Sequence, residues 1–152
     1  LIKLAGGIPC YPSLLGDTLH ACTEFENNRE KMHAALSSLN IKCVELIPSR
    51  NTIDMLADFV KFFHQRNYII LFGTEHNTPE KSSLLISCKN KTEIPVEIKK
   101  IAYDGACVIA AHQFLMKNMN IGYIDDNGNN HCEQIDEFAK FGHSVIHSYL
   151  KR

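Results

Sequence analysis

The residues best suited to chemistry stand together in one short run, Phe72-Gly73-Thr74-Glu75-His76-Asn77. The run sets a carboxylate, Glu75, beside an imidazole, His76, directly after an apolar stretch that ends at Gly73. Zn, Mn and Fe accept such mixed oxygen and nitrogen ligands, and a bound ion can turn water into a nucleophile at neutral pH. We therefore predict that Glu75 and His76 are metal ligands and that Asn77 lines their site. The alternative is a polar loop that only caps the next element.

A second candidate, Arg50, follows Pro48 and Ser49 at the end of another apolar stretch. A planar guanidinium can bind phosphate through two parallel hydrogen bonds, so we predict that Arg50 binds a substrate phosphate. The alternative is an exposed arginine near the start of a helix. Glu45 lies inside the same stretch, where a carboxylate needs a polar partner. For Glu45 we favour a structural pairing over a role in the site.

Other histidines and the cysteines lack the spacing of a metal site. His112 lies on the apolar face of a predicted helix, where a hydrogen-bonded core histidine is more common than a ligand. His143 and His147 are four residues apart, but no third ligand accompanies them, so we favour an exposed helix face. None of the six cysteines forms a Cys-x-x-Cys pair. We predict that they are reduced thiols in a cytoplasmic protein.

Strands and helices alternate in the first half of the chain. Residues 8–11, 42–47 and 68–72 are predicted strands, and the last of them is apolar throughout, as in a parallel strand buried on both faces. Residues 28–39 are a predicted helix, and a second helix is expected to be capped by Asn51. This alternation predicts an α/β fold with parallel strands and helical crossovers. In such folds functional groups gather at the carboxyl ends of the strands.

The second half is predicted to be mainly helical. Residues 97–117 and 133–150 carry apolar residues at helical spacing, and residues 121–130 resemble a hairpin around Asn127-Gly128. Gly105 stands in the middle of the first of these helices, where glycine is unfavourable, so we expect close packing there. Three strands leave unpaired sheet edges. We expect the C-terminal helices or a homodimer partner to cover them.

Length and composition indicate a single ordinary globular domain. The chain has 152 residues and a formal net charge of −1. That balance gives no evident basic surface for nucleic acid or an anionic membrane, and no apolar stretch reaches the length of a membrane helix. The sequence starts at Leu1 within an apolar pattern, from which we expect it to be a fragment of a larger protein.

Residues 40–77 resemble the PHP (polymerase and histidinol phosphatase) superfamily. In that family a strand with a Gly-Ile-Glu-Val-like motif is followed by Pro or Asn and a basic residue. A helix comes next, and then a strand that ends in Gly-Ser-Asp-x-His. The matching segments here are residues 42–50 and 71–76. Upstream, Gly6-Gly7 and Tyr11-Pro12 resemble the family's Gly-Gly stretch and its Ala-His-Pro motif.

The resemblance implies a distorted seven-stranded β/α barrel. Residues 1–80 would form a β-α-β-α-β part with the last three barrel strands, and residues 81–152 a mainly helical extension. It also implies divalent Zn, Mn or Fe at the strand ends, with Glu75 and His76 as the closing ligands. Arg50 would lie near the phosphate of a small phosphorylated substrate, and Tyr11 would line the site.

The chain departs from the family pattern in three places. Tyr11 replaces the histidine of Ala-His-Pro. Glu75 and His76 are adjacent, where the family has a residue between carboxylate and imidazole. The family's His-x-His motif does not occur in these 152 residues.

Three hypotheses follow from this comparison. The first is a PHP-like metal-dependent phosphoesterase whose N-terminal barrel strands and other ligands lie outside this chain, which would be inactive alone. The second is a degenerate, non-catalytic PHP-like domain with a binding or assembly role and no metal of its own. A third, weaker reading is another metal-dependent hydrolase or isomerase on a barrel scaffold.

Overall fold

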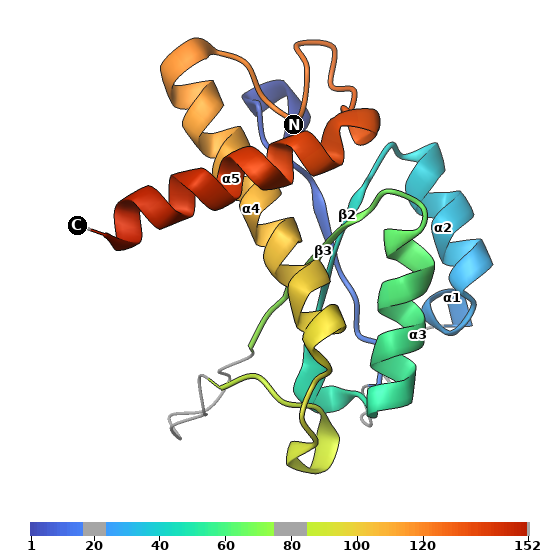
Figure 1. Ribbon diagram of the computed structural model, residues 1–152. Coiled ribbons are helices and arrows are strands. Elements are labelled where there is room, and N and C mark those ends of the chain that lie inside the picture. The colour runs from blue at the N-terminus through green and yellow to red at the C-terminus, as the bar shows by residue number, and fades with distance from the viewer. Residues whose placement is uncertain (17–23, 75–84, 152) are drawn as a thin grey trace, which may run out of the picture.

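The computed structural model describes residues 1–16, 24–74 and 85–151. Its three strands form one parallel sheet in the order β1-β2-β3, with β1 at Cys10–Pro12, β2 at Cys43–Leu46 and β3 at Ile69–Phe72. The α-helices are α1 (Glu24–Asn27), α2 (Arg29–Ser38), α3 (Ile53–His64), α4 (Val96–Met119) and α5 (Ile135–Leu150) (Figure 1). The predicted α/β class, with parallel strands and crossover helices, is confirmed.

Side-chain caps explain where two of these helices begin. The side chain of Asn28 accepts a hydrogen bond from the backbone N–H of Lys31 at 3.0 Å and caps α2. For α3 the cap is Thr52, whose side chain accepts from the N–H of Met55. Our assignment of Asn51 as that cap is wrong, because Asn51 is fully buried and its amide donates to the carbonyl of Ile47 at 3.0 Å.

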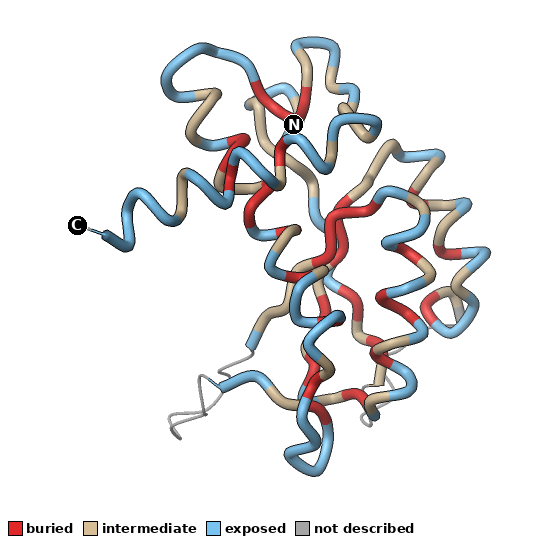
Figure 2. The backbone as a smooth tube through the Cα atoms, viewed as in Figure 1, coloured by how far each residue is buried: buried red, intermediate tan, exposed pale blue. Residues whose placement is uncertain are grey.

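Apolar side chains cover both faces of the sheet. One cluster joins α2 and α3 to alternate strand residues, among them Met32, Leu36, Val44, Leu46, Phe59, Phe63 and Ile70. The other joins α4 and α5 to the remaining strand residues, among them Cys43, Ile69, Val108, Ala111, Tyr123 and Phe138. The central strand is consequently buried from both sides (Figure 2).

Helix α4 lies against the outer edge of β3. The N–H groups of Ile69 and Gly73 donate to the carbonyls of Lys42 and Leu46, both at 2.8 Å. By alternation the backbone of Ile70 therefore points away from β2. Gly105 of α4 lies directly against that backbone, and a Cβ added there would collide with the Ile70 carbonyl. The expectation that a C-terminal helix covers a sheet edge is confirmed for β3.

The opposite edge, on β1, is protected by its sequence. Because the N–H of Ser13 donates to the carbonyl of Glu45 at 2.9 Å, the backbone of Pro12 points outward by the same alternation. Proline has no N–H to offer to a further strand, which is why it is tolerated on edge strands.

The segment between α4 and α5 forms a turn. Ile124 and Asn130 make an isolated antiparallel bridge, and Asp125 Oδ1 accepts the N–H groups of Asn127 and Asn129 at 2.9 and 2.7 Å. The predicted hairpin is therefore present in a minimal form. Among the helices that the structure describes, none combines the length and apolarity needed to span a bilayer.

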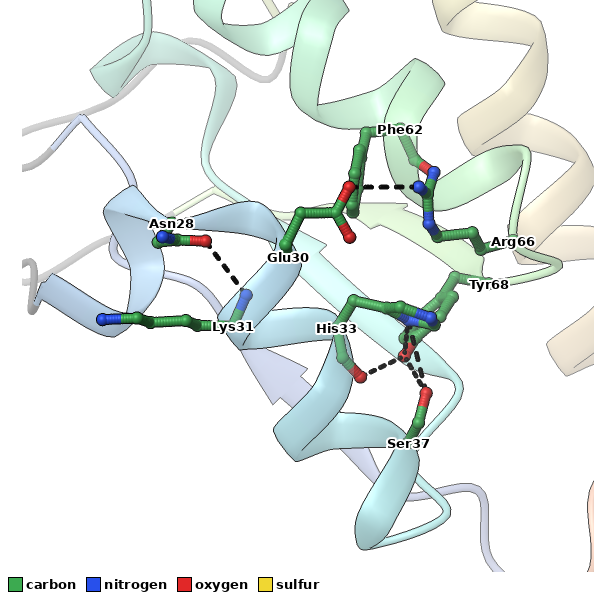
Figure 3. A network of polar contacts seen from close by, with 8 residues as sticks. All are labelled: Asn28, Glu30, Lys31, His33, Ser37, Phe62, Arg66 and Tyr68. Atoms are coloured by element: carbon green, nitrogen blue, oxygen red, sulfur yellow. Dashed lines mark hydrogen bonds and ion pairs between the residues drawn. The ribbon is translucent and has the colours of Figure 1, made fainter.

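A polar cluster closes the amino end of β3 (Figure 3). The Tyr68 ring is buried, and its hydroxyl lies 3.0 Å from His33 Nδ1 and 3.2 Å from Ser37 Oγ. Nearby, the guanidinium of Arg66 lies 3.6 Å from the centre of the Phe62 ring and contacts Glu30. These contacts tie α2, α3 and β3 together at the end of the sheet opposite to the candidate site.

Replacing Tyr68 with phenylalanine is expected to lower the free energy of unfolding by about 1 kcal/mol, because the ring stays buried while its hydrogen bonds are lost. Urea unfolding monitored by circular dichroism measures this loss. A Tyr68→Phe variant as stable as the parent would contradict a stabilising role for the cluster.

Candidate functional site

The carboxyl ends of the three strands meet at one edge of the sheet. In the parallel register Pro12 pairs with Glu45, and Glu45 pairs with Leu71. The chain leaves the strands at Ser13, at residues 47–51 and at Gly73, so these three loops are neighbours. This is the edge at which α/β proteins bind ligands, and it is the edge that the sequence predicted.

Glu45 brings a carboxylate to this edge. Its side chain is half-buried and lies against Gly73, where an added Cβ would collide with Glu45 Oε1. The missing side chain at position 73 thus leaves the space that the carboxylate occupies. The sequence favours a structural pairing for Glu45, whereas the structure places it beside the segment that leads to Glu75. Glu45 therefore joins the candidate residues.

Arg50 ends a single 3-10 turn, Pro48–Arg50, which other segments contact from two sides. Gly16 has a φ of +77°, and an added Cβ would lie 2.6 Å from both the Arg50 carbonyl and Asn51 Oδ1. The carbonyl of Asn51 accepts the N–H of Lys89 at 2.8 Å. The Arg50 side chain is half-buried, and its Nη1 atom is inaccessible to solvent. The backbone that carries Arg50 is consequently well positioned by its neighbours.

Tyr11 lies on the other face of the sheet from Glu45. Its partner in β2 is Val44, its ring packs edge-on against Phe25 with centroids 6.0 Å apart, and its hydroxyl donates to Glu26 Oε1 at 3.3 Å. The structure thus does not bring Tyr11 together with Glu45.

Glu26 is a buried carboxylate that sequence reasoning missed. It is only 1% exposed, and its Oε1 also accepts the N–H of Leu14 at 2.7 Å. It holds the loop that follows β1 against α1. No local pattern in the sequence marks it as buried.

The other predicted site residues, Glu75, His76 and Asn77, lie outside the described residues. A groove of about 440 Å³ opens beside the end of β3, lined by Leu71, Phe72, Leu85, Ile86, Ile94, Lys99, Ala102, Tyr103 and Ala106. Within residues 1–16, 24–74 and 85–151, no three His, Cys, Asp or Glu side chains gather closely enough to hold a metal ion.

Comparisons with protein-family models, curated proteins and solved structures found no match to this chain.

Proposed function

We propose that this chain forms part of a PHP-like metal-dependent phosphoesterase, with its site at the carboxyl edge of the sheet. Glu75 and His76 would bind a divalent Zn, Mn or Fe ion, and the ion would supply the activated water. Arg50 would bind the phosphate of a small phosphorylated substrate. Further ligands would come from additional barrel strands or from a second copy of the chain.

One observation carries this proposal, namely the order of the strands. Three successive strands pair as parallel neighbours in chain order, with α2 and α3 as the crossovers on one face. Such an arrangement brings Arg50 and Gly73 to the same edge, and Glu45 adds a carboxylate beside Gly73. With the carboxylate and imidazole that Glu75 and His76 would add, these groups would make up the set that metal-assisted phosphoester hydrolysis needs.

Metal content tests the proposal directly. We expect the purified chain to hold nearly one equivalent of Zn, Mn or Fe by elemental analysis, and the Glu75→Ala/His76→Ala double variant to lose it. The His143→Ala/His147→Ala double variant is the matched control, because it removes two histidines of the exposed face of α5. Equal metal in all three proteins would contradict the proposal, because the bound metal would then not depend on Glu75 and His76. A chain that binds metal would then be assayed with phosphate esters.

A non-catalytic binding or assembly domain is the second candidate. Two observations favour it. Tyr11 stands where the family has a histidine, and its contacts with Phe25 and Glu26 are those of a packing residue. In addition, α4 occupies the outer edge of β3 beside Ile70, where a closed barrel would need another strand. A chain without metal would support this candidate.

A further inference from the structure

Cys10 and Cys43 face each other across two neighbouring strands. They are direct partners in the pairing of β1 with β2, and their thiols are hydrogen-bonded. Neighbouring strands lie about 4.7–4.9 Å apart, and the Cα atoms of a disulfide lie about 4.4–6.8 Å apart. The backbone therefore already holds this pair at a separation that a disulfide can bridge.

The two thiols differ in their surroundings. Cys10 is exposed on the edge strand, whereas Cys43 is fully buried in the central strand. The hydrogen bond from Cys43 lowers the pKa of the Cys10 thiol, against smaller opposing effects of burial and of Glu45. The same hydrogen bond, with burial, raises the pKa of Cys43. Cys10 is thus the accessible and more easily ionised thiol, and Cys43 stays protonated beside it.

We propose that Cys10 and Cys43 are a modification site at which a hydroperoxide converts the two thiols to a cross-strand disulfide. The Cys10 thiolate attacks the terminal oxygen of the hydroperoxide, an S–O bond forms, the O–O bond breaks, and the alkoxide leaves and takes up a proton. The sulfur of Cys43 then attacks the sulfenic acid on Cys10. An S–S bond forms, the S–O bond breaks, and the hydroxyl leaves as water with the Cys43 proton. Two thiols and one hydroperoxide give one disulfide, one alcohol and one water.

The other described cysteines are less suited to this chemistry. Cys88 and Cys107 are buried, and burial raises the pKa of each thiol. Cys132 is half-buried, and its sulfur accepts a hydrogen bond from the Tyr123 hydroxyl at 3.7 Å. The sulfur of Cys10 is on the exposed edge strand, where a thiol reductant can reach the disulfide, so the modification is reversible.

Peptide mapping of the oxidised parent chain tests this site. The reduced chain is treated with a small excess of hydrogen peroxide, its remaining thiols are alkylated, and its peptides are analysed by mass spectrometry. We expect the loss of two of the six thiols and a linked peptide pair that contains Cys10 and Cys43. Dithiothreitol is expected to remove the link.

Two variants separate the steps. In Cys43→Ala, the sulfenic acid on Cys10 has no thiol beside it, so dimedone is expected to label Cys10 and no link should form. The matched control Cys132→Ser should form the link as the parent does. A parent chain in which Cys10 and Cys132 are oxidised equally without a link, or in which other cysteines are joined, would overturn the proposal. That result comes from the parent alone, so it stands even where a variant fails to fold.

Discussion

Gly105→Ala is expected to lower the free energy of unfolding by about 2–3 kcal/mol, as overpacking of a tight contact does. On helix propensity alone the same change would stabilise the protein by about 1 kcal/mol. The sign is reversed because the new Cβ would meet the carbonyl of Ile70, which belongs to the backbone of β3 and not to a flexible side chain. Helix α4 must therefore move away from the sheet edge that it covers. Urea unfolding of parent and variant measures the difference.

The neighbouring residue provides the control for Gly105. Ala106 is exposed on the same helix, so Ala106→Gly measures the effect of helix propensity alone, without any contact to β3. We expect it to lower the free energy of unfolding by about 1 kcal/mol. Gly142→Ala should resemble Gly105→Ala, because its Cβ would collide with the backbone carbonyl of Cys107 where α5 crosses α4. A Gly105→Ala protein more stable than the parent would show that α4 does not pack on β3 in this way.

The elements were predictable because burial leaves a pattern in the sequence. Residues 68–72 are apolar throughout because β3 is covered on both faces, and the alternation of strands with helical stretches predicted the parallel sheet. Helix ends are harder to predict. Asn51 and Thr52 are both good capping residues, and the choice depends on the contact of Asn51 with the distant segment at Lys89.

The candidate site was predictable only in part, because the local sequence does not determine which residues of neighbouring strands pair with one another. A slip of one residue in β2 would turn Glu45 to the other face of the sheet and separate Cys43 from Cys10. Gly105 predicted a close contact, but the sequence of its helix does not indicate that the contacting element is β3. Arg50 stands at the expected edge, whereas the roles of Glu75 and His76 stay predictions that the metal analysis tests.

His112→Ala is expected to lower the free energy of unfolding by about 2–4 kcal/mol, because it removes the partner of the buried Tyr123 N–H and of the half-buried Gly6 carbonyl. His112 is 5% exposed, its Nε2 lies 2.7 Å from the carbonyl of Gly6, and its Nδ1 accepts the N–H of Tyr123 at 3.0 Å. The predicted core histidine with satisfied hydrogen bonds is thus confirmed. The ring connects the N-terminal segment, α4 and the turn before α5. His147→Ala, at an exposed position of α5, is the matched control and should change stability by less than about 0.5 kcal/mol.

The same contacts make the stability contributed by His112 depend on pH. Burial lowers the pKa of His112 below its ordinary value, and Nδ1 cannot take up a proton while it accepts the N–H of Tyr123. As the pH falls, the unfolded chain therefore binds the proton before the folded chain does. The stability contributed by His112 is complete above a pH of about 6.5 and is lost as the pH falls through the folded-state pKa.

Burial, followed by Lys42 and Arg66, also lowers the pKa of His33, so the parent should lose stability from both histidines on acidification. Urea unfolding at several pH values below neutrality should give a smaller loss for His112→Ala than for the parent. Equal pH dependence of the two proteins would mean that His112 titrates normally and that the Tyr123 contact does not hold it neutral.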